Sequence, residues 1–485
     1  MSKDHKRKIL LVHPLGYSSE KADGDISRIA NITPPLGIAS ISAYLSQNNI
    51  ESDIIDCYAH PDADNKIKVY LEKEKPGFIG FSCSTSTFLD GIRLARIVKT
   101  INPETKVVFG GAHVSALKES IVSNYEPVDY VVVGEGEQTL TELMQSDYNN
   151  ISKIKNIVYK NREEQVVFTG YRKILLELDT LPFPAYEKLE GYPEKYKLPI
   201  FNYPVTPNSS CISSRGCPYT CSYCDRSVFR KSFRYNSAQY LCDHLKYLNQ
   251  KFGIKHINFY DDQFTFNKKR IMKFCQLMIN CNLKMSFNCA ARAEHLDSEL
   301  IAAMKSAGCW MISLGIETGD ENLLSQHRQN ADVEMLREKI KLIKKAKIRV
   351  KALLMMGLPG ETEQSIKNSK KYVFSLPIDD FNLAKFTPFP GSPIYQQIKQ
   401  GEVMGSFDEN WERMDCMEFL FVPNSIKKEK MEKLFVDFYR SHFMRHRTLF
   451  NYITMIWKSP DSWHRFFQNF FSFMGFVINK KRHKS

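Results

Sequence analysis

The sequence predicts an α/β protein with two domains built from parallel strands and a mainly helical carboxyl-terminal extension. Short β-branched runs alternate with helical segments from Lys8 to about Ser146, and the alternation returns after about Pro207. Prolines break the pattern between these regions, as is typical of a linker. We expect a doubly wound, Rossmann or flavodoxin-like domain at 1–150, a linker at 151–206, a partial (βα)6 barrel at 207–395 and the extension at 396–485.

Five strand candidates make up the parallel sheet predicted for the first domain. Apolar residues at helical spacing fill the gaps between them, so each crossover is expected to be a helix. Doubly wound domains bind ligands beyond the carboxyl ends of their strands, and small residues at these ends leave room for a large ligand. The candidates are KILLVHP, SDIIDCY, GFIGFSCST, KVVFGGAHVS and YVVVGEGE.

Six strand candidates follow the linker: SSCIS, HINFYDD, MSFNCAA, WMISLGIET, VKALLMMG and DFNLAKFTPF. Six βα units predict an open parallel barrel instead of a closed ring of eight. Barrel active sites lie at the carboxyl ends of the strands. The segment SSRGCPYTCSYCD directly follows the first of these strands, so its cysteines are expected at the barrel mouth.

The cysteine pattern CxxxCxxC, at Cys217, Cys221 and Cys224, is the strongest chemical signal in the chain. The other cysteines are scattered singly, which argues against a disulfide framework and indicates a reducing cytoplasm. A structural zinc site needs a fourth ligand, and Cys211 lies inside a predicted strand. Three thiolates on one loop suit three corners of a cubane iron–sulfur cluster with one iron left open. Zinc or isolated structural thiols are the alternative.

This loop, with an aromatic residue just before its last cysteine, resembles the hallmark of the radical S-adenosylmethionine (SAM) superfamily. The segments FYDDQF, NCAARAEHL, GIETG, MMGLPGET and TPFPGSPIY extend the resemblance. In that family the open iron chelates SAM, and one electron from the cluster cleaves SAM to a 5′-deoxyadenosyl radical. The resemblance implies a 4Fe-4S cluster on the three cysteines. It also implies SAM contacts from Tyr223, Arg292, Glu317 and Gly357.

Arg292 and Glu317 are expected to end the third and fourth barrel strands and to project into the barrel mouth. There a guanidinium can pair with a carboxylate, and a glutamate can accept hydrogen bonds from ribose hydroxyls or an ammonium. The alternative role of each is a salt bridge that closes the top of the barrel.

The amino-terminal half resembles a cobalamin-binding domain in PPLGIASISAYL, GFSCSTST, VVFGGAHVS and VVVGEGEQTL. Many such domains supply a cobalt-ligating histidine through a DxHxxG loop, but this chain reads LVHPLG, with Leu11 in the Asp position. Without a carboxylate to orient the ring, we prefer a histidine that ends a buried strand over a cobalt ligand for His13. The resemblance implies cobalamin contacts from Ser82, Ser84, Thr85, Gly110, Gly111, Gly134 and Glu135.

Two other classes of protein fit the sequence less well. RNA methylthiotransferases share this architecture, but their front domain carries three further cysteine ligands, and here it has only Cys57 and Cys83, on different strands. A nucleic-acid-binding protein would explain the formal charge of +13. Residues 440–485, however, hold nine Lys or Arg and a single acid, Asp461, so most of that charge belongs to the tail. We expect no nucleic-acid partner.

The tail contains eleven aromatic residues, and several fall on one face of a predicted helix. With the terminal cations Lys480, Lys481, Arg482 and Lys484, this helix suits the surface of an anionic membrane. A helix that caps the barrel is the alternative. The aromatic face comprises Trp463, Phe466, Phe467, Phe470, Met474 and Val477.

The start of the chain does not match a signal peptide, and no apolar stretch of ~18 residues predicts a membrane span. We therefore expect a cytoplasmic protein, attached peripherally to the inner face of the membrane if the tail binds lipid.

Together the resemblances imply a cobalamin-dependent radical SAM enzyme that methylates an unactivated carbon of a hydrophobic or natural-product-like small molecule. The alternative is an oxidative cyclase or rearranging enzyme acting on a tetrapyrrole or isoprenoid lipid, because FYRSHFMRHRTLF is similar to the extension of anaerobic magnesium-protoporphyrin cyclases and hopanoid-tailoring enzymes. A cofactor-sensing protein is a third possibility. An electron donor such as flavodoxin or ferredoxin is implied as a partner.

Overall fold

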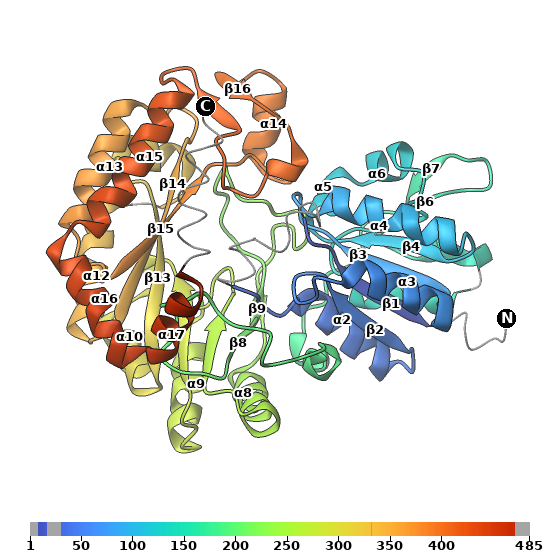
Figure 1. Ribbon diagram of the computed structural model, residues 1–485, viewed down its shortest axis with the longest axis horizontal. Coiled ribbons are helices and arrows are strands. Elements are labelled where there is room, and N and C mark those ends of the chain that lie inside the picture. The colour runs from blue at the N-terminus through green and yellow to red at the C-terminus, as the bar shows by residue number, and fades with distance from the viewer. Residues whose placement is uncertain (1–7, 17–30, 147, 331, 471–485) are drawn as a thin grey trace.

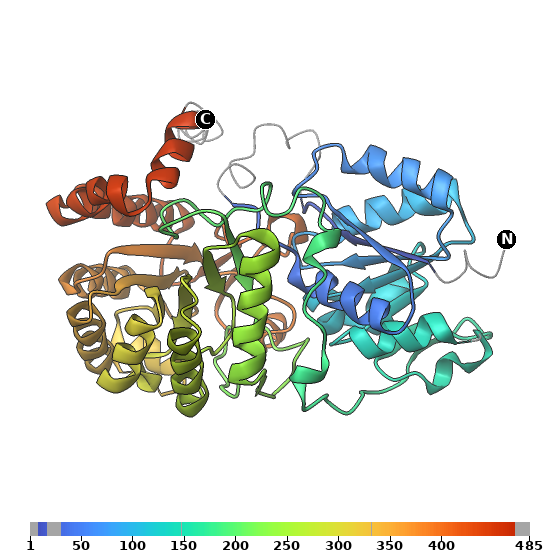
Figure 2. The ribbon, with the colours of Figure 1, turned by 90° about the horizontal axis from the view of Figure 1, so that it is seen from below.

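The computed structural model describes residues 8–16, 31–146, 148–330 and 332–470. It consists of an amino-terminal α/β domain and a partial barrel that lie side by side, with the carboxyl-terminal helices on the barrel (Figure 1). Seen from below, these helices stay on the barrel side of the molecule (Figure 2).

The amino-terminal sheet has the strand order β2-β1-β3-β4-β5-β6-β7. Its first five strands run parallel, as the sequence predicts, in the 2-1-3-4-5 order of flavodoxin-like folds. These strands are β1 (Ile9–His13), β2 (Ser52–Asp56), β3 (Phe78–Ser82), β4 (Lys106–Gly110) and β5 (Tyr130–Val132).

Helices cover both faces of this sheet. In α4 the apolar residues Phe88, Ile92, Ala95 and Val98 are spaced for one helical face and are buried against the sheet. The helices described in this domain are α2 (Leu36–Gln47), α3 (Ala63–Glu74), α4 (Phe88–Ile101), α5 (Ala112–Leu117), α6 (Glu119–Asn124) and α7 (Glu137–Gln145).

A β-hairpin extends the sheet into the segment predicted as a linker. Strands β6 (Ile157–Lys160) and β7 (Val166–Phe168) pair antiparallel, and β6 also pairs antiparallel with β5. Asn161 shapes the turn, because its Oδ1 accepts from the amides of Glu163 and Gln165, each at 2.9 Å. The sequence predicts a linker in this segment and does not predict the hairpin.

The rest of the linker packs between the two domains. It contains 3-10 helices at Leu178–Thr180 and Tyr186–Lys188. Tyr186 and Tyr196 are fully or almost fully buried in one apolar core, which includes Ile38 of α2 and Leu241 of the barrel. The linker therefore joins the two domains through a continuous hydrophobic core.

The barrel is a six-stranded parallel sheet with the order β15-β14-β13-β12-β11-β8, which confirms the predicted partial barrel. Its strands are β8 (Asn208–Cys211), β11 (His256–Phe259), β12 (Ser286–Ala291), β13 (Cys309–Glu317), β14 (Arg349–Met356) and β15 (Asp380–Lys385).

The barrel helices begin at polar caps. Ser237, Asn267, Asp297, Asp320, Asp332 and Thr362 each accept from an amide of the first turn. The helices are α8 (Ala238–Phe252), α9 (Lys268–Asn280), α10 (Ser298–Ser306), α11 (Glu321–His327), α12 (Val333–Lys345) and α13 (Glu363–Ser375).

The part of the extension that the structure describes, up to residue 470, contains a small hairpin, β16 (Gly405–Phe407) and β17 (Phe421–Pro423), and four α-helices. Two short strands, β9 (Ser214–Arg215) and β10 (Arg234–Tyr235), form a separate ribbon after β8. The helices of the extension are α14 (Pro393–Lys399), α15 (Lys428–Phe443), α16 (His446–Lys458) and α17 (Pro460–Gln468).

The described part of the predicted tail helix, α17, packs against the linker. Rings of Trp463 and Phe466 contact the ring of Phe201. Arg465 is buried and donates to the carbonyl of Leu198 at 2.9 Å. These contacts suit the alternative given for this helix, in which it packs against the protein and not against a membrane. Met474, Val477 and the terminal cations lie outside the described residues.

Candidate functional site

The three predicted cluster ligands lie in the loop after the first barrel strand. Cys217, Cys221 and Cys224 line one cavity of about 260 Å³. The loop turns at Gly216, where φ is +84° and an added Cβ would lie 2.2 Å from the carbonyl oxygen of Ser232. Only glycine fits this turn, which sets Cys217 into the cavity wall.

The chemistry of these thiols fits an iron–sulfur cluster. Burial raises the pKa of the Cys217 thiol. Burial, reinforced by Cys221, raises the pKa of Cys224 to about 12. Neighbouring thiolates repel one another, and iron binding removes that repulsion. The donor set therefore suits three corners of a 4Fe-4S cluster.

Two of the predicted SAM contacts, Tyr223 and Glu317, meet beside this loop. Glu317 ends β13 at a β-bulge, with φ of +61°. Burial raises the pKa of its carboxyl, and Arg328, 3.9 Å away, opposes that shift. A hydrogen bond from Tyr223 also opposes the rise in the pKa of Glu317, so the two side chains are neighbours.

Arg292 follows β12 and faces the cysteine loop. Its guanidinium lies 3.7 Å from the centroid of the Tyr219 ring, and Nη1 lies 3.8 Å from the Sγ of Cys221. Nε donates to Glu294 at 2.5 Å. Arg292 and Glu317 thus have separate ion-pair partners, Glu294 and Arg328, and both remain at the barrel mouth.

Gly357, the fourth predicted SAM contact, is buried in the loop after β14. It has φ of +98°, and an added Cβ would lie 3.1 Å from Cε of Met431. Its amide donates to the carboxylate of Glu361. Gly357 does not line the cysteine cavity, so its contact with SAM stays a prediction.

Glu361 gives this loop a pH-dependent stability. Burial raises the pKa of its carboxyl to about 8, although the amides of Gly357 and Leu358 oppose that shift. The folded state therefore binds a proton more tightly than the unfolded state, whose carboxyl keeps its ordinary pKa near 4.5. The free energy of unfolding is largest below that ordinary value and falls, by up to about 1.4 kcal/mol per pH unit, as the pH rises to about 8.

We expect Glu361→Gln to flatten this slope, because glutamine still accepts from Gly357 and carries no charge. Thermal unfolding midpoints of both proteins, measured between about pH 5 and 8, check the prediction. Glu363→Gln, at the first residue of the neighbouring helix α13, is the matched control and should keep the wild-type slope between these pH values. Parallel pH profiles for Glu361→Gln and the wild type would contradict the assignment.

The predicted cobalamin contacts divide into three groups. Ser82, Gly110, Gly111 and Gly134 line a pocket of about 60 Å³ at the carboxyl ends of β3, β4 and β5. An added Cβ at Gly110 would meet no atom within 4 Å, so a side chain there would fill this open cradle. The open space at Gly110 leaves room for a ligand beyond these strand ends, where doubly wound domains bind their ligands.

Ser84 and Thr85 instead take part in local hydrogen bonds. The Ser84 amide donates to Oγ1 of Thr87 at 2.9 Å, and Oγ1 of the buried Thr85 lies 3.3 Å from Nδ1 of His113. Neither residue lines the pocket at the strand ends. Their contact with cobalamin stays a prediction.

His13 has a carboxylate partner that the sequence analysis did not find. Its Nδ1 lies 3.0 Å from Oδ1 of Asp56, which ends the neighbouring strand β2 at the same register. The expectation that no carboxylate orients this imidazole is therefore wrong. The partner comes from an adjacent strand and not from the loop motif.

Glu135 belongs to an ion-pair network that joins the two domains. Its carboxylate accepts from Arg215 at 2.7 Å and from Arg234 at 2.9 Å. Arg215 also pairs with Glu137 at 2.6 Å. Although burial alone would raise it, the Arg215 guanidinium holds the pKa of Glu137 below its usual value. Sequence analysis missed Arg215, which lies two residues before Cys217.

A second connection brings the cysteine loop to the glycine-lined pocket. Oγ of Ser227 donates to the carbonyl of Ala112 at 3.0 Å, and Ala112 follows Gly111 directly. Ala112 also lines the cysteine cavity. The two candidate cofactor sites therefore adjoin each other across the domain boundary.

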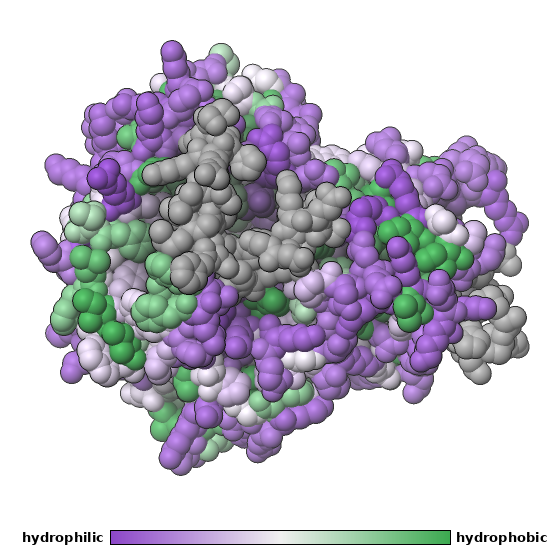
Figure 3. Space-filling view, in the orientation of Figure 1, coloured by the Kyte–Doolittle hydropathy of each residue, from purple (hydrophilic) through white to green (hydrophobic). Residues whose placement is uncertain are grey.

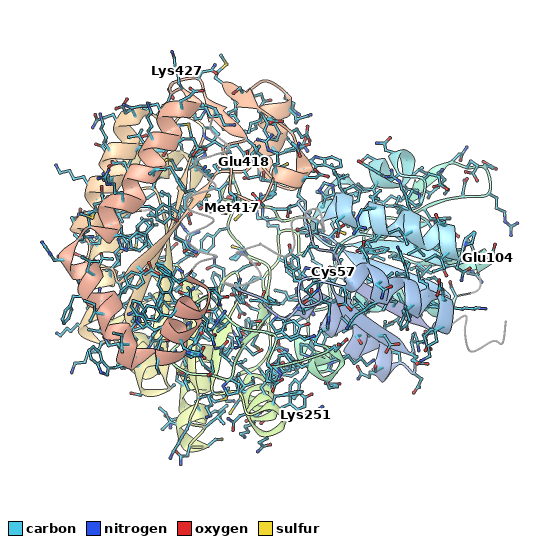
Figure 4. The ribbon with its side chains drawn as sticks, in the orientation of Figure 1. Cys57, Glu104, Lys251, Met417, Glu418 and Lys427 are labelled. Carbon is cyan, nitrogen blue, oxygen red and sulfur yellow. The ribbon has the colours of Figure 1, made fainter. Side chains whose placement is uncertain are left out.

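The cysteines of the amino-terminal domain take no part in this site. Cys57 and Cys83 are buried in the apolar core of that domain. Figure 4 shows Cys57 on the amino-terminal side of the domain boundary. Neither thiol lines the cavity that contains Cys217, Cys221 and Cys224, so neither is placed to bind the cluster.

Comparisons with known proteins agree with this arrangement. Residues 23–144 match the B12 binding domain family, and residues 211–373 match the radical SAM superfamily. The chain is 28% identical over 446 residues to the uncharacterized methyltransferase PH0819 of Pyrococcus horikoshii, covering 91% of this chain and 94% of that protein. It is 25% identical to the anaerobic magnesium-protoporphyrin IX monomethyl ester cyclase of Rubrivivax gelatinosus, covering 90% and 77%.

Among solved structures, the fold resembles the radical SAM methyltransferase TsrM from Kitasatospora setae, solved with cobalamin and a 4Fe-4S cluster. The TM-score is 0.64 at 17% identity, covering 81% of this chain and 75% of that one. The B12-binding and radical SAM domains give the present chain its cofactors: cobalamin, a 4Fe-4S cluster and SAM. Domain content, relatives and fold thus agree, and the chain belongs to the radical SAM enzymes that carry a B12-binding domain.

Proposed function

We propose that this enzyme methylates an unactivated carbon of a small molecule at the boundary between its two domains. The observation that carries the proposal is the junction of the cysteine cavity and the glycine-lined pocket through Ala112 and Ser227. Together the bound cofactors supply a radical that removes hydrogen from the substrate and a methyl group that replaces it.

The residues of this chain bind these cofactors and enclose the reacting groups. Cys217, Cys221 and Cys224 bind the cluster, and Tyr223 and Glu317 contact SAM. Arg292 lies near Cys221, where its charge stabilises the thiolate. A flavodoxin or ferredoxin donates the electron that starts the reaction.

Two cavities indicate what kind of substrate fits. One, of about 180 Å³ between the domains, has mainly apolar walls that include Leu181, Pro184 and Phe229, and it also reaches Gly111 and Gly134 of the predicted cobalamin contacts. The other, of about 220 Å³ inside the barrel, contains amides and the buried Lys351. The first cavity would thus be shared with cobalamin, and the amides and the ammonium of the second suit a small molecule with hydrogen-bonding groups. The apolar walls also help to exclude water from a reactive intermediate.

The test is incubation of the anaerobically reconstituted, cobalamin-loaded chain with SAM labelled in its methyl group and candidate lipids or tetrapyrroles. We expect the label in the product, with a new carbon–carbon bond located by mass spectrometry. An unlabelled, oxidised product would assign the enzyme to the cyclase class, which the relative from Rubrivivax gelatinosus represents. SAM that stays intact under every reducing condition would contradict both proposals and favour a sensor.

A further inference from the structure

Helix α16 presents an exposed apolar face on the outside of the barrel domain. Phe450 and Trp457 are 64% and 73% exposed, and Ile453 between them is also exposed. With Leu449 and Ile456, these residues recur at helical spacing and form one stripe, the α16 face. Figure 3 shows hydrophobic surface gathered in this region of the barrel lobe. A tryptophan this exposed is unusual on a surface that meets only water.

The opposite side of α16 holds the helix to the protein. Met455 is fully buried, and the hydroxyl of Tyr452 donates to Asp380 of β15 at 3.1 Å. The neighbouring helix α17 is fixed separately, since the amide of Phe201 donates to Ser462 at 2.9 Å. The α16 face is therefore the outer surface of an anchored helix, whose outward orientation the inner contacts set.

The charged residues beside the α16 face indicate what kind of surface it can contact. Arg447 and Lys458, both exposed, lie along one edge of the stripe at opposite ends of α16. Between residues 440 and 470 the sequence has a single acid, Asp461, and its carboxylate accepts from the hydroxyl of Tyr203 at 2.7 Å. Aromatic residues flanked by cations match the interface of an anionic bilayer, where Trp lies at headgroup level.

We propose that the α16 face is a docking surface for an anionic membrane. Leu449, Phe450, Ile453, Ile456 and Trp457 insert shallowly between lipids while Arg447 and Lys458 contact the headgroups. Attachment is peripheral, and within the part of the chain that the structure describes no helix is long and apolar enough to cross a bilayer. Of the aromatic stripe expected on the tail helix, Phe467 and Phe470 are exposed, and the α16 face is a further apolar surface on the preceding helix.

Co-sedimentation of the full chain with vesicles of phosphatidylcholine, with and without phosphatidylserine, tests this proposal. We expect binding to vesicles that contain phosphatidylserine and weakening by salt. The double variant Phe450→Ser with Trp457→Ser should bind about tenfold more weakly or worse. Reversing the charges, with Arg447→Glu and Lys458→Glu, should reduce binding to phosphatidylserine by at least about tenfold.

The matched control removes two apolar side chains that are equally exposed elsewhere, Leu176→Ser with Met404→Ser, and should bind as the wild type does. All four substituted apolar residues are exposed, so none of these variants is expected to unfold the protein. Equal sedimentation of the wild type and the α16 variants would overturn the proposal. So would a dimer in analytical ultracentrifugation that the Phe450→Ser, Trp457→Ser variant alone dissociates, because the face would then bind a second copy. Neither outcome bears on catalysis.

Discussion

Replacing Cys217, Cys221 and Cys224 together with alanine is expected to abolish reductive cleavage of SAM, with a loss of about a thousandfold or more. Without these thiolates nothing in the loop holds iron, so no electron reaches SAM. The measurement is 5′-deoxyadenosine formed by the anaerobically reconstituted chain, together with its iron content.

Two controls make this result specific to the cluster. Cys281→Ala removes an exposed thiol at the end of α9 and should leave both quantities unchanged. Far-ultraviolet circular dichroism of the triple variant should match the wild type, because the three cysteines lie on a loop and not in the barrel sheet. A triple variant that still forms 5′-deoxyadenosine at the wild-type rate would refute the assignment of these ligands.

Arg215→Met should lower the free energy of unfolding by about 3 kcal/mol. The change removes the cation between Glu135 and Glu137 and leaves a buried carboxylate without its partner, which costs more than the pair itself contributes. Chemical denaturation followed by tryptophan fluorescence measures the loss. Arg96→Met, an exposed arginine on α4, is the matched control and should change stability by less than about 0.5 kcal/mol.

A double-mutant cycle shows whether the effect arises from this pair. Arg215→Met combined with Glu137→Gln should recover part of the lost stability, because no unpaired charge then remains at Glu137. If the double variant is as unstable as the two single effects added together, Arg215 and Glu137 are not coupled, and the network does not join the domains.

The sequence predicted the parts of the fold in which apolar, strand-like runs alternate with helical segments. All five parallel strands of the first sheet and all six barrel strands coincide with apolar runs between helical segments. The barrel topology then placed Arg292 and Glu317 at strand ends, where the structure has them. The β6–β7 hairpin was missed because it lies in the segment assigned to the linker and has no helical segment between its strands.

The rest of the candidate site depends on contacts between distant segments. Arg215 and Glu135 are separated by 80 positions, and no local pattern links them. The same holds for His13 and Asp56, which meet only because β1 and β2 pair in register. Long-range pairing of polar side chains follows from the tertiary fold, so a single sequence does not reveal it.

The central claim is that one chain unites a 4Fe-4S cluster with cobalamin, and metal and cofactor analysis tests it most directly. The full chain, reconstituted without oxygen with iron, sulfide and cobalamin, is desalted and measured for iron, sulfide, cobalt and zinc. We predict about four iron, about four sulfide and about one cobalt per chain, with 5′-deoxyadenosine formed on reduction in the presence of SAM. A chain that retains stoichiometric zinc, takes up no cobalamin and leaves SAM intact would contradict the account.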